Sequence, residues 1–321
     1  MKIEEYEFDQ KTFLSISVDN KLTPSNLNKI EDLASNDTIG YISLNSQQTL
    51  KTWQEINRII VTYSPAIRIS LSHRDDEFDD LSFLENLPDI QELYIFLYKL
   101  KDLSPISHLK KLKVLKFFNA FQSAKVRLKP LTSLKQLEEL SIFHVKDIEE
   151  ITNFTSLKKL GLKSLKSDHL NFLKPLINLE KIELRSSDRI TDYSGLYDLP
   201  KLSEAFIVKN YKDTTAEFVS HLKHLKKLDI TDFNSVSKFP SLEKLDKLTD
   251  LSITSWKILN DISGVAKAKN LIEFSAFVGP EFKPSALTVL KGHPTLKNIR
   301  AGFNTKIEEA DYETLRKEIL E

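Results

Sequence analysis

The hexapeptide LKKLGL at residues 157–162 recurs, in altered form, along almost the whole chain. Its leucines follow the pattern L-x-x-L-x-L, and the last two stand two residues apart. Apolar residues in alternation predict a β-strand with one buried face. Ten segments between residues 90 and 301 share the pattern, some with aromatic or alanine substitutes: IQELYI (90–95), LKVLKF (112–117), LEELSI (137–142), LKKLGL (157–162), LEKIEL (179–184), LSEAFI (202–207), LKKLDI (225–230), LTDLSI (248–253), LIEFSA (271–276) and LKNIRA (296–301).

Three earlier segments extend the series toward the N-terminus: FLSISV (13–18), IGYISL (39–44) and AIRISL (66–71). The starts of successive units are 20 to 27 residues apart. Recurrence at such a period indicates a solenoid, because one unit cannot bury its own apolar stripe whereas stacked units share a continuous core. We therefore predict an α/β solenoid of about 12–13 units, with a curved parallel sheet and return segments behind it.

The chain resembles the leucine-rich repeat family over nearly its whole length. The segments LKDLSPISHLKKL (100–112), RITDYSGLYDLPKL (189–202) and ILNDISGVAKAKNL (258–271) carry a likeness to the 22-residue, internalin-like class. The family pattern places an asparagine at the ninth repeat position, and from residue 98 onward only Asn210 and Asn304 keep it. The resemblance implies a leucine-rich repeat solenoid with a mostly lost asparagine ladder, and we predict irregular turns after the strands.

The return segments are mostly short, which favours single helical turns, but the first two are longer. Residues 23–35 and 46–60 predict true helices, and Thr23 with Pro24 makes a good N-cap and first helical residue. The apolar residues of 306–321 stand near helical spacing and predict a closing helix. We predict one domain over 1–321: an N-terminal cap with longer helical repeats (1–65), regular repeats (66–305) and a C-terminal capping helix (306–321).

Composition excludes several classes of function. The 321 residues contain 46 basic and 46 acidic side chains, which argues against a nucleic-acid or membrane-surface partner. No cysteine is present, so disulfides and thiolate chemistry are excluded. The N-terminal residues do not resemble a secretory signal, and no apolar run approaches the ~18 residues of a membrane span. We predict a soluble, cytoplasmic protein.

Candidate sites for chemistry are weak. His221 and His224 could share one helical face, but a third metal ligand is missing, and a polar return segment explains them as well. The acidic run HRDDEFDD (73–80) could attract a hard cation or form a solvated turn, and its spacing matches no calcium loop. Phosphate-loop and nucleophile motifs are absent from the sequence. We predict a non-enzymatic protein without a metal or cofactor.

The outward positions of the units are more informative, because the core does not need them. Positions three, five and seven face outward. Position seven carries Phe96, Phe118 and Phe143, which a strand spacing of about 4.8 Å would bring side by side. Adjoining exposed aromatics are typical of binding hot spots. Adding the neighbouring outward residues and a basic strip, we predict a partner-binding surface of Tyr94, Phe96, Lys116, Phe118, Phe143, Lys159, Lys163, Lys181 and Arg185.

Structural alternatives stay open for both parts of this surface. The rings could pack on one another as cross-strand pairs, and the irregular segment 120–131 could cover them. The basic strip could be a solvated face. Further along, Asp229, Asp232 and Asp250 make the outward face acidic.

The repeat and its zoned face favour a protein–protein interaction scaffold that binds a protein partner on the strand face. Its biological form would be an intracellular bacterial adaptor or a toxin-neutralising immunity protein. The alternative is carbohydrate or small-ligand recognition on the aromatic row. Nucleic-acid binding and membership of a larger assembly are further hypotheses, and balanced charge opposes the former.

Overall fold

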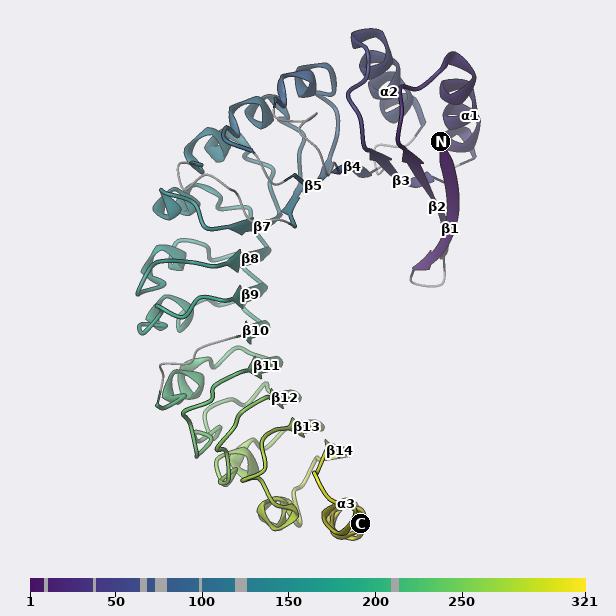
Figure 1. Cartoon of the computed structure of the whole chain (residues 1–321). Coiled ribbons are helices and arrows are strands. Elements are labelled where there is room, and N and C mark those ends of the chain that lie inside the picture. Colours follow the sequence, from purple (N-terminus) through teal and green to yellow (C-terminus); the bar gives the residue numbers. More distant parts are fainter. Residues whose placement is uncertain are drawn as a thin grey trace. The chain divides into compact units, whose positions relative to one another are not determined.

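The computed structural model describes residues 1–8, 11–36, 39–63, 68–72, 80–97, 100–118, 126–208 and 214–321. The chain divides into two compact units, Met1–Leu157 and Lys158–Glu321. Within each unit the strands follow one another in chain order, and the return segments lie along one side of the sheet (Figure 1). The opposite side of the sheet, formed by repeat positions three, five and seven, is called the strand face below.

The described residues of the first unit form seven strands. The N-terminal strand β1 (Lys2–Phe8) pairs antiparallel with β2 (Lys11–Val18), and each later strand pairs parallel with the one before it. The sequence pattern did not predict β1, because its residues lack the apolar alternation that marks the repeats. The later strands are β3 (Ile39–Leu44), β4 (Arg68–Ser72), β5 (Glu92–Phe96), β6 (Val114–Phe117) and β7 (Glu139–Phe143).

The described return segments of the first unit carry two α-helices and four 3₁₀ turns. The predicted N-cap is confirmed: the Thr23 hydroxyl accepts a hydrogen bond from the Asn26 backbone N–H, and Pro24 opens the helix. The predicted change from long to short return segments is also confirmed. The elements are α1 (Pro24–Ser35), α2 (Leu50–Tyr63), η1 (Ser82–Asn86), η2 (Ser104–His108), η3 (Lys129–Ser133) and η4 (Ile148–Asn153).

In the second unit, the part of the chain that the structure describes forms seven parallel strands and ends in a helix. Its strands are β8 (Lys159–Lys163), β9 (Lys181–Arg185), β10 (Glu204–Val208), β11 (Lys227–Thr231), β12 (Asp250–Thr254), β13 (Glu273–Phe277) and β14 (Asn298–Ala301). The return segments carry η5 (Asn171–Leu173), η6 (Ser194–Leu196), η7 (Glu217–His221), η8 (Val265–Lys267) and η9 (Pro284–Leu290), and α3 (Lys306–Leu320) follows the last strand. The thirteen predicted repeats therefore correspond to β2–β14.

Positions four and six of the repeats form the core, as the alternation predicts. In β8 and β9 the four such residues, Leu160, Leu162, Ile182 and Leu184, are all buried and stand opposite one another in register. Burying one such side chain stabilises the fold by ~1.5–3 kcal/mol. Because every strand repeats this contact with the next, the core runs the length of each unit.

The predicted irregular turns are wrong for four repeats. The residue at position eight adopts a left-handed backbone in each of them: Ser164, Ser186, Asp232 and Ser255. At three of these positions the backbone N–H donates to the carbonyl oxygen that ends the next strand, over 2.7 to 3.0 Å. This backbone bond makes the turns regular without the asparagine side chain.

The ninth position is also ordered, by other side chains. Trp256 is fully buried, and its indole N–H donates to the Ile230 backbone carbonyl 3.2 Å away. Ser187 donates to the Arg185 carbonyl and accepts from the Leu165 N–H, so it links two repeats. A hydrogen-bond donor at the ninth position can therefore replace the missing asparagine.

Candidate functional site

The strand face of the first unit carries a group of stacked rings, here called the aromatic stack: Tyr41, Tyr94, Phe96 and Phe118. Phe96 and Phe118 lie parallel, with ring centroids 4.2 Å apart and an interplanar angle of 4°. Tyr94 stacks on Phe118 at 6.1 Å, and Tyr41 meets Tyr94 edge-on at 5.8 Å. Parallel pairing of β5 with β6 produces this arrangement, because it places Tyr94 opposite Lys116 and directs Phe118 beside Phe96.

Phe118 remains partly open despite these contacts. Its backbone is fixed by a 3.0 Å bond from its N–H to the Ile95 carbonyl, yet 40% of the residue is exposed. Phe96, Tyr94 and Phe143 are half-buried. Half of the covering segment that we considered, 120–131, lies outside the described residues, which resume at 126.

Polar groups fix the edge of the aromatic stack. The Tyr94 hydroxyl donates to Glu92 over 3.0 Å. The Lys116 ammonium lies 5.7 Å from the centre of the Tyr94 ring and 2.6 Å from a Glu139 carboxylate oxygen. Lys116 is therefore engaged by a ring and a carboxylate together, so it orders the stack as well as bordering it.

The four predicted basic residues of the second unit stand in two opposed pairs, Lys159 with Lys181 and Lys163 with Arg185. Nearby carboxylates offset part of their charge. Lys181 lies 2.9 Å from Glu204, and this ion pair lowers the pKa of the glutamate.

Arg185 is engaged on two sides. It forms an ion pair with Glu183, and its guanidinium carbon lies 4.5 Å from the centre of the Phe206 ring. The basic strip is therefore less positive than its sequence indicates, because the repeat pattern does not show which nearby carboxylate each cation pairs with.

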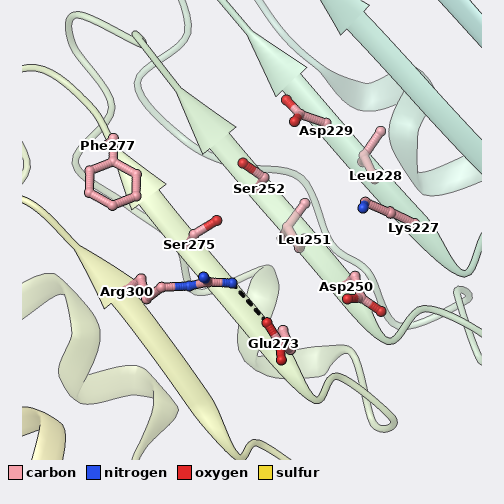
Figure 2. A pocket seen from close by; sticks show the side chains of 10 residues that line it. All are labelled: Lys227, Leu228, Asp229, Asp250, Leu251, Ser252, Glu273, Ser275, Phe277 and Arg300. Carbon is pink, nitrogen blue, oxygen red and sulfur yellow. Dashed lines mark hydrogen bonds and ion pairs between the residues drawn. The ribbon is translucent and has the colours of Figure 1, made fainter. Parts of the chain in front are cut away.

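A groove on the strand face of the second unit was not predicted. It crosses β11–β14, encloses about 430 Å³ and is here called the C-terminal groove (Figure 2). The side chains of Ser252 and Ser275 form its floor, and they stand opposite each other in register. The outward residues that line it are Lys227, Asp229, Asp250, Ser252, Glu273, Ser275, Phe277 and Arg300.

The groove has different chemistry on each side. At the β14 end, Arg300 forms a 2.9 Å ion pair with Glu273, drawn in Figure 2. At the β11 end, burial raises the pKa of Asp229 above its ordinary value, with opposing contributions from the Thr231 hydroxyl and from Lys227. The Phe277 ring is half exposed and is the apolar wall.

The sequence contained a signal for this groove. Position five holds small serines in two successive repeats, Ser252 and Ser275, and longer residues in the repeats on either side. Two neighbouring small side chains predict a hollow in the sheet surface. For the aromatic stack, following the outward positions back to the repeat IGYISL (39–44) would have reached Tyr41.

Among the described residues, no group of three or more histidines and carboxylates is placed to hold a metal ion. His221 stacks on Tyr197 at 4.7 Å. The acidic run 73–80 lies outside the described residues except for Asp80, whose carboxylate accepts a hydrogen bond from the Ser82 N–H at the start of η1. The absence of enzymatic activity stays a prediction. Within the part of the chain that the structure describes, no helix is long and apolar enough to cross a membrane.

The stacked L-x-x-L-x-L strands and short return turns define a leucine-rich repeat fold. An internalin of Listeria monocytogenes (inlF) is similar over 93% of this chain and 84% of its own, with a TM-score of 0.57 and 21% identity. A leucine-rich repeat protein of Leptospira interrogans is similar over 88% and 82%, with a TM-score of 0.54 and 17% identity.

A third similar structure comes from the Toll–Spätzle complex of Drosophila. It matches 90% of this chain and 43% of its own, with a TM-score of 0.56 and 14% identity. No protein-family model and no curated protein matches the sequence. At these identities the solved structures establish the fold.

Proposed function

We propose that the chain is a protein–protein interaction scaffold that binds a partner protein through its strand face, with the aromatic stack as the anchor. The observation that carries this proposal is the exposure of Phe118. The backbone N–H of Phe118 is hydrogen-bonded to the Ile95 carbonyl, and its ring stacks on Phe96. Even so, 40% of the residue is exposed to solvent. A ring held in this way loses little conformational freedom on binding, which favours affinity.

The expected contribution of Phe118 can be worked out from its exposure. With 40% of the residue exposed and a surface of about 200 Å² per phenylalanine, about 80 Å² remains for a partner to cover. At ~25 cal/mol per Å² this amounts to ~2 kcal/mol, or about thirtyfold in Kd.

The test begins with a pull-down from native lysate, using the full chain and its Phe118→Ala variant. Proteins retained by the wild type are purified, and their Kd values for the wild type and the variants are measured. The matched control is Ile177→Ala, which removes a more exposed apolar side chain from a return segment. A partner that binds both variants as tightly as the wild type would refute the assignment of the anchor.

We further propose that the protein acts inside a bacterial cell, as an adaptor or a toxin-neutralising immunity protein. Two of the similar structures come from bacteria, which supports a bacterial origin for this chain. A toxin encoded beside this gene would be the natural partner to test, by co-expression and rescue of growth. Toxicity that persists in the presence of the chain would exclude the immunity role for that toxin.

Carbohydrate recognition on the aromatic row is the second candidate. A sugar stacks on an open ring face, and Phe118 offers a partly exposed ring. Its parallel contact with Phe96 at 4.2 Å covers one face of each ring, so this candidate has less surface to use. A glycan array probed with the full chain tests it, and a Phe118-dependent signal would favour it over protein binding.

A further inference from the structure

The C-terminal groove lies on the strand face of the second unit, whereas the aromatic stack lies on the strand face of the first. We propose that the groove accepts a basic side chain, lysine or arginine, of a bound protein partner. This inference rests on the proposed protein-binding function and adds the chemistry of one contact. Charge complementarity, the shape of the floor and the single apolar wall are the three observations behind it.

The charges of the groove do not balance. Three carboxylates line it, from Asp229, Asp250 and Glu273, against two cations, from Lys227 and Arg300. Glu273 and Arg300 satisfy each other in a 2.9 Å ion pair. One negative charge is left at the β11–β12 end when all the carboxylates are ionised, so a single added cation would neutralise the groove.

Asp229 and Asp250 share the one cation Lys227, and their internal hydrogen-bond donors are hydroxyl groups. Asp229 accepts a hydrogen bond from the Thr231 hydroxyl at 3.2 Å, and Asp250 accepts one from Thr249 at 2.6 Å. Among the described residues neither forms an ion pair within 4.0 Å. Asp229 is also partly buried, and a half-desolvated carboxylate gains most from a cation that reaches it directly.

The floor fits the stem of a long side chain. Parallel register sets Asp229 beside Ser252, Ser252 beside Ser275, and Ser275 beside Arg300. Adjacent strands lie about 4.8 Å apart, so this row is about 14 Å long. An extended lysine or arginine lying along it would cover the two serines with its methylene groups and place its charge at the aspartates.

The apolar wall strengthens this interpretation. The Phe277 ring is 50% exposed and lies against Gly302, where an added Cβ would come within 3.0 Å of the ring. The absent side chain at Gly302 thus leaves room for the ring at the rim. A methylene stem passing Phe277 would bury part of it, whereas an acidic side chain would face three carboxylates.

The experiment uses the ¹⁵N-labelled full chain and four capped peptides, Gly-Ser-Gly-X-Gly-Ser-Gly, with lysine, arginine, norleucine or glutamate at X. We expect the lysine and arginine peptides to shift the backbone amide resonances of Ser252 and Ser275, with a Kd on the order of 1 mM for a single side chain. Norleucine keeps the stem and lacks the charge, so its peptide should bind at least about fivefold more weakly. Equal shifts with norleucine, or none with any peptide, would overturn the proposal.

Substitutions distinguish binding in the groove from general attraction to acidic side chains. The double variant Asp229→Asn/Asp250→Asn should weaken lysine-peptide binding at least about fivefold. The control Glu243→Gln/Glu281→Gln removes as much charge from exposed positions outside the groove and should leave binding unchanged. If both double variants weaken binding equally, the site is diffuse electrostatic attraction and the proposal is wrong.

The test also distinguishes this inference from the proposed function. If Phe118→Ala weakens a protein partner while the peptides leave the groove unchanged, the scaffold function stands and the inference fails. If the peptides bind the groove while Phe118→Ala leaves every partner unaffected, the aromatic anchor fails and the groove inference stands.

Discussion

Tyr312 closes the end of the second unit, and removing its hydroxyl should destabilise that unit. The residue lies in α3, is almost fully buried and reaches the backbone of β14. Its hydroxyl donates to the Ile299 carbonyl at 2.9 Å and accepts from the Ala301 N–H at 3.1 Å. We expect the substitution Tyr312→Phe to break both bonds while keeping the ring in place.

The two broken bonds differ in their consequences. The Ile299 carbonyl keeps a second donor, the Arg316 side chain at 3.0 Å, so its loss amounts to one ordinary hydrogen bond, ~1 kcal/mol. The Ala301 N–H is left buried without its acceptor, which costs a further ~1–3 kcal/mol. We therefore expect the free energy of unfolding of the second unit to fall by roughly 2–4 kcal/mol.

The assay uses the positions of the two tryptophans, one in each unit. In a Trp53→Phe background, urea unfolding followed by Trp256 fluorescence reports on the second unit. Tyr197→Phe is the matched control, because no hydrogen bond of the Tyr197 hydroxyl occurs in the described residues, and it should change stability by less than about 0.5 kcal/mol.

The double variant Tyr312→Phe/Arg316→Ala sharpens the test. It removes both side-chain donors from the Ile299 carbonyl, so its effect should exceed the sum of the two single effects. A loss below about 0.5 kcal/mol for Tyr312→Phe, or strict additivity in the double variant, would refute this reasoning.

Three further predictions concern the second unit. Gly264→Ala would place a Cβ 2.1 Å from a backbone carbonyl oxygen, so we expect a loss of about 2 kcal/mol or more by urea unfolding. Trp256→Phe loses a buried hydrogen bond and ring volume, about 2–4 kcal/mol, and should cost more than Trp53→Phe, whose indole N–H has no partner among the described residues. Burial raises the folded-state pKa of Asp229, so its stabilisation is present below about pH 4 and is lost as pH rises through the raised pKa. Asp229→Asn should therefore gain stability relative to the wild type between about pH 4 and pH 7, and an unchanged difference would contradict the assignment.

Most of the fold was predictable because the repeat is a local pattern. Each L-x-x-L-x-L segment carries its own alternation, so the strands from β2 to β14 could be placed one by one. Strand β1 could not, because its pairing with β2 depends on a hairpin and not on the repeat. The turns were mispredicted because they were judged by the asparagine missing from position nine, whereas the backbone N–H of position eight makes the bond.

The candidate site was predicted in part. The row of Phe96 and Phe118 could be predicted by numbering the repeat positions. Parallel strands in register place the same position of neighbouring repeats side by side. The neutralisation of Lys181 by Glu204 did not follow, because an ion pair depends on how two long side chains turn toward each other. Binding at these residues stays a prediction.

The sequence by itself determined which residues face the core and which face outward, because alternation with period two assigns every strand residue to a side. Only the tertiary structure decided what the outward residues become. It made Phe118 a stacked yet partly open ring, paired Arg300 with Glu273, and left the two carboxylates of Asp229 and Asp250 with one cation, Lys227, at the end of a serine-floored groove. The physical reason is that register fixes which residues are neighbours, whereas side-chain packing, burial and charge across several strands decide how those neighbours interact.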